Sequence, residues 1–458
     1  MSEAAGAAPA VPRGAGTPGG VVWALVAAAF VWRWVLAQLT PVPAEDGVNY
    51  LWMAQEFARG RLGAGLAEVF PPLLPLLAAP GIALGLDPLL AARAVLCVAG
   101  ALALVPIARL TAGATPAVRV VVIALAGASP LAARFCGEVY TEPLFVLLAA
   151  LALDAGLRGR DWCSGLWAAC ATWTRPEGAA LALAFALVRP RTAWRALLVV
   201  GTAVAALALL RGALGHGYAP IAKLPILLER ANVAGGDLRE SLARFAQGAL
   251  ALPGIWIEAF DVLGVLGLAG AGLVLFGRES ARRREFLPLF VLLGLVLVAI
   301  LAFVPRRRFL VGWLAVLAPF AALACRGLPQ RWLGIVLVAG LAIGAVRGFR
   351  VTGSSRLVER DLGRYLATRL APGEDVATDL TRVRWYAGLR PLPPRHFAAE
   401  ELIAASLAPG VRFVVIGVLR PTAATWRAAL GASFVPAALP AGLAERLPER
   451  GVEVFERR

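Results

Sequence analysis

Long apolar runs alternate with short polar segments over the first three quarters of the chain. A helix needs about 20 mostly apolar residues to cross a membrane, and several runs approach or exceed that length. The candidate spans are residues 21–39, 88–109, 117–134, 142–157, 196–214, 254–276, 286–304, 309–325 and 332–349. This pattern predicts an all-α polytopic membrane bundle.

Two further apolar runs are shorter or interrupted. Residues 162–188 contain the polar segment from Thr174 to Gly178, which includes Pro176, and residues 71–86 begin with Pro71 and Pro72. We expect two short helices that meet near Pro176 in the first run, and a re-entrant or interfacial helix in the second. With these, the bundle would hold about 10–12 membrane helices.

Composition supports a membrane protein. Hydrophobic residues make up 59% of the 458, and the mean hydropathy is +0.74. Charged residues account for 16%, against about 25% in soluble domains. The net charge is +16 and Lys223 is the only lysine; in such a chain basic residues are typical of cytoplasmic loops near lipid phosphates, so nucleic acid is not an expected partner. Five cysteines and two histidines show no ligand spacing, so no metal or other cofactor is expected, although a divalent ion stays open.

Arginines in the short loops predict the orientation, because such residues favour the cytoplasmic side. The basic loops are 109–119, 158–160, 189–195, 278–284 and 326–331. Placing them inside puts the N-terminus in the cytoplasm, with residues 1–20 as a disordered tail. The first long loop, 40–70, then lies outside with residues 135–141, 215–253 and 305–308. The membrane domain would extend over 21–350.

Residues 351–458 are more polar and predict a small extracytoplasmic α/β domain. We expect a helix at 355–370, strands at 375–380, 411–419 and 452–456, and helices near 399–407 and 422–430. No phosphate loop, catalytic triad or metal motif is present there.

Carboxylates at the predicted outer surface are candidates for chemistry. Glu45 and Asp46 follow the first span, and a carboxylate there can take a proton from a substrate hydroxyl. Asp46 could equally cap a helix from Gly47 to Arg59. Glu142 begins a span behind Thr141, where a carboxylate also favours helix initiation.

Charged residues inside the interrupted run are candidates by position. Arg175 and Glu177 lie at membrane depth, where ionisable groups usually serve function or pair with one another. An Arg175–Glu142 or Arg175–Glu177 ion pair would be the purely structural alternative.

A cationic cluster on the predicted outer side departs from the charge rule for loops. Arg306, Arg307 and Arg308 follow Pro305, and Lys223 follows His216 in another outer loop. These cations could bind a phosphate; contact with lipid headgroups or, for Lys223, chance survival are the alternatives.

Taken together, these segments resemble the GT-C membrane glycosyltransferases that use polyprenyl-phosphate sugars, a group that includes protein O-mannosyltransferases and lipid A aminoarabinose transferases. The resemblance covers roughly 21–350 and rests on segments that are each short. They are Asp46–Tyr50 with Ala54 and Gly60, Phe70–Leu73, Thr141–Leu144, Thr174–Gly178, Gly217–Lys223 and Arg308–Phe309 with Pro319. Gly47 departs from the family pattern, which often has a second acidic residue there.

The resemblance implies a reaction and its participants. A sugar would pass, with inversion at its anomeric carbon, from a polyprenyl-phosphate donor to a hydroxyl of a lipid, glycan or protein, on the outer face of a bacterial plasma membrane. Asp46 would be the catalytic carboxylate, with Glu45 as a second candidate, and Tyr50, Glu142, Arg175, Glu177, His216, Lys223 and Arg306 to Arg308 would bind substrate.

Three other functions remain open from the sequence. Broken helices with charges also suit a transporter or flippase, but such a protein would show an internal repeat, and none is visible. A polysaccharide ligase or polymerase would place its key residues in one long loop such as 215–253. A non-catalytic scaffold would give Asp46, Glu142 and Arg175 no reason to share one side.

Overall fold

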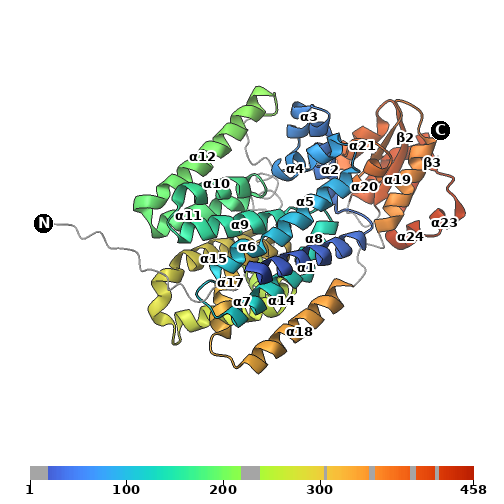
Figure 1. Ribbon diagram of the computed structural model, residues 1–458. Helices are drawn as coiled ribbons and strands as arrows, with labels where there is room; N and C mark the ends of the chain where they lie inside the picture. Colours follow the sequence, from blue (N-terminus) through green and yellow to red (C-terminus); the bar gives the residue numbers. More distant parts are fainter. Residues whose placement is uncertain (1–18, 218–237, 304–306, 350–355, 392–398, 418–421) are drawn as a thin grey trace.

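The computed structural model describes residues 19–217, 238–303, 307–349, 356–391, 399–417 and 422–458. Its larger part is a bundle of helices, and a small mixed domain packs at one end (Figure 1). The first half of the bundle comprises α1 (Gly19–Gln38), α2 (Glu45–Ala58), α3 (Leu62–Leu66), α4 (Leu73–Ala83), α5 (Pro88–Leu102), α6 (Leu104–Leu110), α7 (Pro116–Ala128), α8 (Pro130–Gly137) and α9 (Glu142–Leu157). The second half comprises α10 (Asp161–Thr172), η1 (Pro176–Gly178), α11 (Ala179–Val188), α12 (Pro190–Ala213), α14 (Leu238–Leu275), η2 (Ser280–Arg282), α15 (Arg283–Phe303), α16 (Arg307–Val311), α17 (Leu314–Cys325) and α18 (Gln330–Gly348).

The bundle is that of an integral membrane protein. Among the described residues, six helical stretches are long and apolar enough to cross a membrane: Gly19–Gln38, Pro88–Leu110, Pro116–Gly137, Pro190–Ala213, Phe245–Leu275 and Gln330–Gly348. Shorter apolar helices, Leu73–Ala83, Pro176–Val188 and Leu314–Cys325, lie among them. The predicted all-α bundle with short and broken helices is therefore confirmed.

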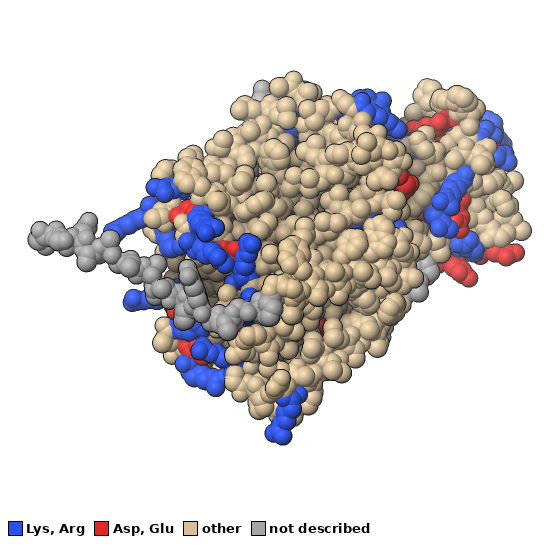
Figure 2. Space-filling view, viewed as in Figure 1, with Lys and Arg blue, Asp and Glu red and all other residues tan. Residues whose placement is uncertain are grey.

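Charge gathers at the two ends of the molecule. Figure 2 shows a broad uncharged belt, with arginines concentrated at the end of the bundle away from the small domain. Two of the predicted basic loops meet there, because Arg278 donates to the carbonyl of Arg326 at 3.0 Å. We call the opposite end, which carries loop 40–70 and the small domain, the site end. Which side of a membrane each end faces stays a prediction.

Proline positions explain where several helices begin. Pro88, Pro116, Pro130 and Pro190 each lie in the first turn of a helix, where the missing N–H group costs nothing. The polar interruption of the run 162–188 works the same way: α10 ends at Thr172, Pro176 opens the 3₁₀ turn η1, and α11 continues. The two short helices expected there are present.

The predicted helix after the first span begins earlier than expected. Helix α2 starts at Glu45 with Ala44 as its N-cap, so Asp46 lies within the first turn and does not cap the helix. A carboxylate in the first turn is favoured by the helix dipole without any capping bond. Helix α1 likewise begins at Gly19, two residues inside the predicted tail.

The C-terminal domain is built on a four-stranded sheet in the order β1-β2-β4-β3. Strands β1 (Asp375–Thr378) and β2 (Val411–Gly417) are parallel, whereas β4 (Val452–Arg457) runs antiparallel to both β2 and β3 (Phe434–Pro436). The helices are α19 (Leu357–Arg369), α20 (Thr381–Tyr386), α21 (Ala399–Leu407), α22 (Ala423–Leu430), α23 (Ala441–Ala444) and α24 (Leu447–Arg450), with η4 (Gly431–Ser433). The expected small α/β domain is confirmed, and the sequence did not predict β3, α20, α23 and α24.

Candidate active site

Two arginine–carboxylate groups lie at the site end, and each joins segments far apart in the sequence. Arg308 of α16 donates through Nη1 to Oδ2 of Asp46 on α2 at 2.9 Å. Arg175, in the bend before η1, donates to Oε1 of Glu142 at 2.5 Å and to Oε1 of Glu177 at 2.9 Å. These five charged candidates from separate segments therefore come together in two linked groups.

The chain holds these side chains at helix ends. Glu142 is the first residue of α9, with Thr141 at the N-cap and Pro143 in the first turn, so the helix dipole favours its charge. Arg175 has an extended backbone, with φ of −154° and ψ of 135°, which turns the chain between α10 and η1. A five-residue helix, α16, carries Arg308. Helix starts, one short helix and a bend thus supply the charged groups of the site.

Aromatic rings line the arginines. The Arg308 guanidinium lies 5.6 Å from the ring centre of Tyr140 and 5.1 Å from that of Phe309. The Arg175 guanidinium lies 5.3 Å from the same Phe309 ring. Such cation–π contacts are stronger where water is excluded. Neither ring was predicted as a site residue. The available signals were the Arg308–Phe309 segment of the family resemblance and the position of Tyr140, two residues before Glu142.

Tyr50 lies between the two groups. Its side chain is buried and packs edge-on against Phe70, with ring centres 5.2 Å apart. Burial raises the pKa of the Tyr50 phenol well above its ordinary value; the Asp46 charge raises this pKa further, and Arg175 lowers it. Tyr50 therefore keeps its proton and can donate a hydrogen bond in the site.

The cluster has hydrogen-bonding capacity left over. Glu142 is 1% exposed, and its Oε2 atom has no hydrogen-bond partner within the described part of the chain. The same holds, over those residues, for the buried Nε of Arg308. Buried polar atoms are usually paired, so an acceptor on Glu142 and a donor on Arg308 are open to a bound molecule.

Close packing explains the glycine after Asp46. A Cβ atom on Gly47 would lie 2.6 Å from the carbonyl oxygen of Glu138 and 3.1 Å from Cβ of Val139. The same Glu138 carbonyl accepts a hydrogen bond from the Ala44 backbone at 2.9 Å, and Val139 has a positive φ of 60°. The start of α2 therefore rests directly on loop 138–139, and no side chain fits at position 47 unless that loop moves.

Other sequence candidates lie apart from these pairs. Glu45 points to the C-terminal domain, with Oε1 3.6 Å from Nη2 of Arg382. Arg307, next to Arg308, pairs with Glu258 of α14 at 3.3 Å. His216 lies beside Gly63 of α3, and within the described residues its buried Nε2 has no hydrogen-bond partner. Lys223 and Arg306 lie outside the described residues.

Among the described residues, no group of three or more His, Cys, Asp or Glu side chains is placed to hold a metal ion. What the arrangement offers is a carboxylate beside a cation, with a second carboxylate and cation next to them. Such a set can accept a proton and stabilise an anion at the same place.

Comparison with known proteins identifies the fold. No family model and no curated protein matches the sequence. Among solved structures, ArnT from Cupriavidus metallidurans bound to undecaprenyl phosphate aligns with a TM-score of 0.66 and 14% identity, covering 95% of this chain and 98% of that one. The apo oligosaccharyltransferase of Archaeoglobus fulgidus aligns with a TM-score of 0.61 and 13% identity, covering 88% of this chain and 71% of that one. Its complex with an inhibitory peptide and a dolichol-phosphate gives 0.57 and 14%, over 87% and 69%. The chain therefore has the GT-C fold.

Proposed function

We propose that this membrane protein transfers a sugar from a polyprenyl-phosphate donor to an acceptor hydroxyl, with Asp46 as the general base. One observation carries the proposal: the Asp46–Arg308 pair joins a carboxylate and a cation at the site end, next to a second such group around Arg175. Two of the similar solved structures, one with undecaprenyl phosphate and one with a dolichol-phosphate, support a lipid-phosphate donor.

In the proposed reaction, Asp46 acts on the group that attacks the sugar, and Arg308 acts on the group that leaves it. Asp46 accepts the proton of the acceptor hydroxyl while the hydroxyl oxygen forms a bond to the anomeric carbon. The bond between that carbon and the phosphate oxygen breaks, and the released lipid phosphate gains negative charge. Arg308 stabilises that charge through hydrogen bonds from its guanidinium. Attack from the side opposite the phosphate inverts the anomeric configuration.

The ion pair with Arg308 also offers a way to time the proton transfer. Arg308 donates to Asp46 at 2.9 Å. A bound phosphate group competes for the same guanidinium, whose Nε is unused among the described residues. When Arg308 turns towards the phosphate, the Asp46 carboxylate loses a donor and becomes a better proton acceptor. Donor binding would thus activate the base.

Several finer parts belong to the same proposal. Glu142 and Tyr50 would bind the hydroxyls of the sugar, and Arg175, held by Glu142 and Glu177, would keep Glu142 charged. Arg306, Arg307 and Lys223 would guide the anionic donor towards Arg308, and His216 would contact substrate from the side of α3. The site end would face the outside of a bacterial plasma membrane.

The test is transfer of labelled sugar from polyprenyl-phosphate donors in membranes that carry the native chain or Asp46→Asn. Loss of a general base typically costs about 10²- to 10⁴-fold in rate, so we expect a loss in that range. A matched control is Glu285→Gln, which neutralises an exposed carboxylate at the far end of the bundle. Transfer by Asp46→Asn at the native rate would contradict the role of Asp46, and no transfer by the native chain with any donor would contradict the function.

A further inference from the structure

The C-terminal domain meets the bundle through charges of opposite sign. Three arginines of the domain each pair with a glutamate near the site end of the bundle. The pairs are Arg356–Glu138 at 3.2 Å, Arg382–Glu45 at 3.6 Å and Arg390–Glu68 at 3.2 Å. Because all three glutamates lie on α2 or in segments close to it, the domain contacts the part of the chain that carries Asp46.

Aromatic contacts reinforce the same junction. The guanidinium of Arg390 lies 4.5 Å from the ring centre of Trp52, which is on α2. Trp385 of α20 packs against the apolar core of the bundle, and α20 as a whole contacts α2. The domain is therefore fitted to α2 by shape as well as by charge.

Arg382 has an unusual position in this junction. It is 4% exposed, and its guanidinium donates two hydrogen bonds to Glu359 of α19, at 2.8 and 2.9 Å. Glu359 is itself 1% exposed. This fork-like pairing fixes the plane of the guanidinium. Its Nη2 atom, which donates to Glu359, also lies 3.6 Å from Oε1 of Glu45. A rigid cation is thus presented to the first turn of α2.

Glu45 directly precedes the proposed base. Both residues lie in the first turn of α2, where the backbone is anchored on one side by the bond from Ala44 to the Glu138 carbonyl. Glu138 in turn is held by Arg356 of the C-terminal domain. Two of the three arginines therefore act on the few residues that set the direction of the Asp46 side chain.

We propose that Arg382 is a positioning residue: through Glu45 it fixes the first turn of α2 so that Asp46 is aimed at Arg308 and the substrate. This inference rests on the proposed function, and it gives the C-terminal domain a part in the reaction other than chemistry. It also assigns Glu45 to the domain junction in place of the catalytic role expected from the sequence. A misplacement of about 1 Å at a reacting group can cost up to about 100-fold in rate.

Two variants remove the contact without leaving a buried charge alone. Glu45→Gln removes the charge from the half-exposed partner, and Arg382 keeps its bonds to Glu359. The pair Arg382→Gln with Glu359→Gln neutralises both buried members together, which avoids the large penalty of an unpaired buried ion. Arg427→Gln breaks an exposed ion pair with Glu453 elsewhere on the domain and is the matched control.

The measurement is kcat and the KM for the lipid-phosphate donor, together with hydrogen exchange at the start of α2, where the amides of Ala44 and Val48 donate to the carbonyls of Glu138 and Ala44. We expect kcat to fall about fivefold in Glu45→Gln and in the paired variant, with KM nearly constant, and no further loss when all three changes are combined. Amide exchange in the first turn should quicken in each. The control should match the native chain in both readouts.

Three results would overturn the inference. The first is unchanged kcat and unchanged exchange in both variants. The second is multiplication of the two losses in the combined variant, since residues acting through one contact are not additive. The third is a loss of 100-fold or more in Glu45→Gln alone with α2 exchange unchanged, which would return Glu45 to the chemistry. If the native chain transfers no sugar, the proposed function fails, and the exchange measurement still decides whether Arg382 orders α2.

Discussion

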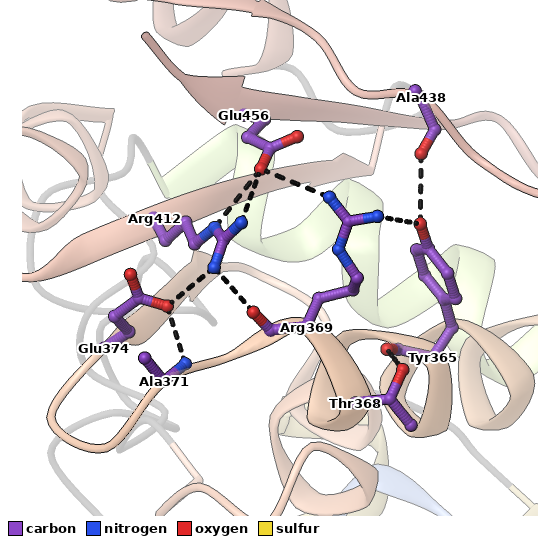
Figure 3. Close-up of polar contacts among 8 residues, drawn as sticks. All are labelled: Tyr365, Thr368, Arg369, Ala371, Glu374, Arg412, Ala438 and Glu456. Carbon is purple, nitrogen blue, oxygen red and sulfur yellow. Dashed lines mark hydrogen bonds and ion pairs between the residues drawn. The ribbon is translucent and has the colours of Figure 1, made fainter.

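Two arginine–carboxylate clusters in this molecule differ in how fully their polar atoms are used. In the C-terminal domain, Arg412 donates to Glu456 at 3.1 and 3.2 Å, to Glu374 at 3.1 Å and to the carbonyl of Arg369 at 2.6 Å (Figure 3). Arg369 extends the network to Glu456 at 3.8 Å and to the hydroxyl of Tyr365 at 3.4 Å. Every nitrogen of the Arg412 guanidinium has a protein partner.

The cluster at the site end has spare capacity in a more buried setting. Arg308 donates to Asp46 through one nitrogen, and within the described residues its buried Nε and the buried Oε2 of Glu142 have no hydrogen-bond partner. A saturated network at the surface stabilises a fold, whereas an unsaturated one in the interior can exchange a partner for substrate. We therefore assign the saturated cluster to stability and the unsaturated one to the proposed binding of substrate, although both consist of the same residue types.

The largest expected effect comes from breaking the buried pair at Arg175. Arg175→Gln would leave Glu142, which is 1% exposed, as an uncompensated buried charge. Breaking such a pair costs about 3–5 kcal/mol, so we expect a marked drop in the thermal unfolding midpoint of the detergent-solubilised protein. Glu142→Gln removes the charge itself and keeps an oxygen that accepts from Arg175, so its midpoint should fall less. Equal drops in the two variants would mean that the buried charge is not what Arg175 compensates.

A second, smaller effect tests the packing behind Asp46. In a helix, Gly→Ala normally stabilises by about 0.5–1 kcal/mol, but a Cβ on Gly47 meets the Glu138 carbonyl at 2.6 Å. Overpacking of this kind costs about 1–3 kcal/mol, so Gly47→Ala should lower both the unfolding midpoint and the transfer rate. Gly201→Ala in α12 is the control, because a Cβ there meets nothing within 4 Å. A stabilised and fully active Gly47→Ala protein would show that the loop 138–139 yields freely.

The smallest effect is expected at the saturated cluster. Arg412→Gln should leave sugar transfer unchanged and should only quicken hydrogen exchange of β2 and β4. The backbone N–H of Ala371 and the Arg412 guanidinium lower the pKa of Glu374 below its ordinary value of 4.5. The stability from this pairing is therefore present above pH 4.5 and is lost as the pH falls through the lowered pKa. The exchange difference between Arg412→Gln and native protein should shrink over that range; a difference independent of pH would exclude Glu374 as its source.

Much of the fold could be predicted from the sequence, because local sequence patterns determine where its helices lie. Apolar length gives the spans, and proline gives the break at Pro176 and the starts of helices such as Pro88. Strand β3, with three residues, exists through pairing with β4 and has no local pattern of its own. Helix α20 is likewise too short for a local pattern to predict, and it is placed by its contact with α2.

The charged members of the candidate site could be selected from the sequence, but their directions could not. Position at the predicted outer surface selected Asp46 and Glu142. Membrane depth selected Arg175, and the departure from the loop charge rule selected the cluster that contains Arg308. The neighbouring residues Arg307 and Arg308 were indistinguishable in sequence, yet one faces Glu258 and the other Asp46. Helix α16 has five residues, too few for a periodic pattern to assign its faces. The pairing of Glu45 with Arg382, 337 positions later in the chain, is tertiary and has no sequence signal.

The central claim is that Asp46 and Arg308 work as one unit in sugar transfer from a lipid phosphate. The most direct test is a double-mutant cycle on kcat with Asp46→Asn, Arg308→Gln and both together. The account predicts a loss of about 10²- to 10³-fold for Arg308→Gln, an equal or larger loss for Asp46→Asn, and a combined loss far smaller than the product of the two. Losses that multiply, or native activity in either single variant, would contradict it.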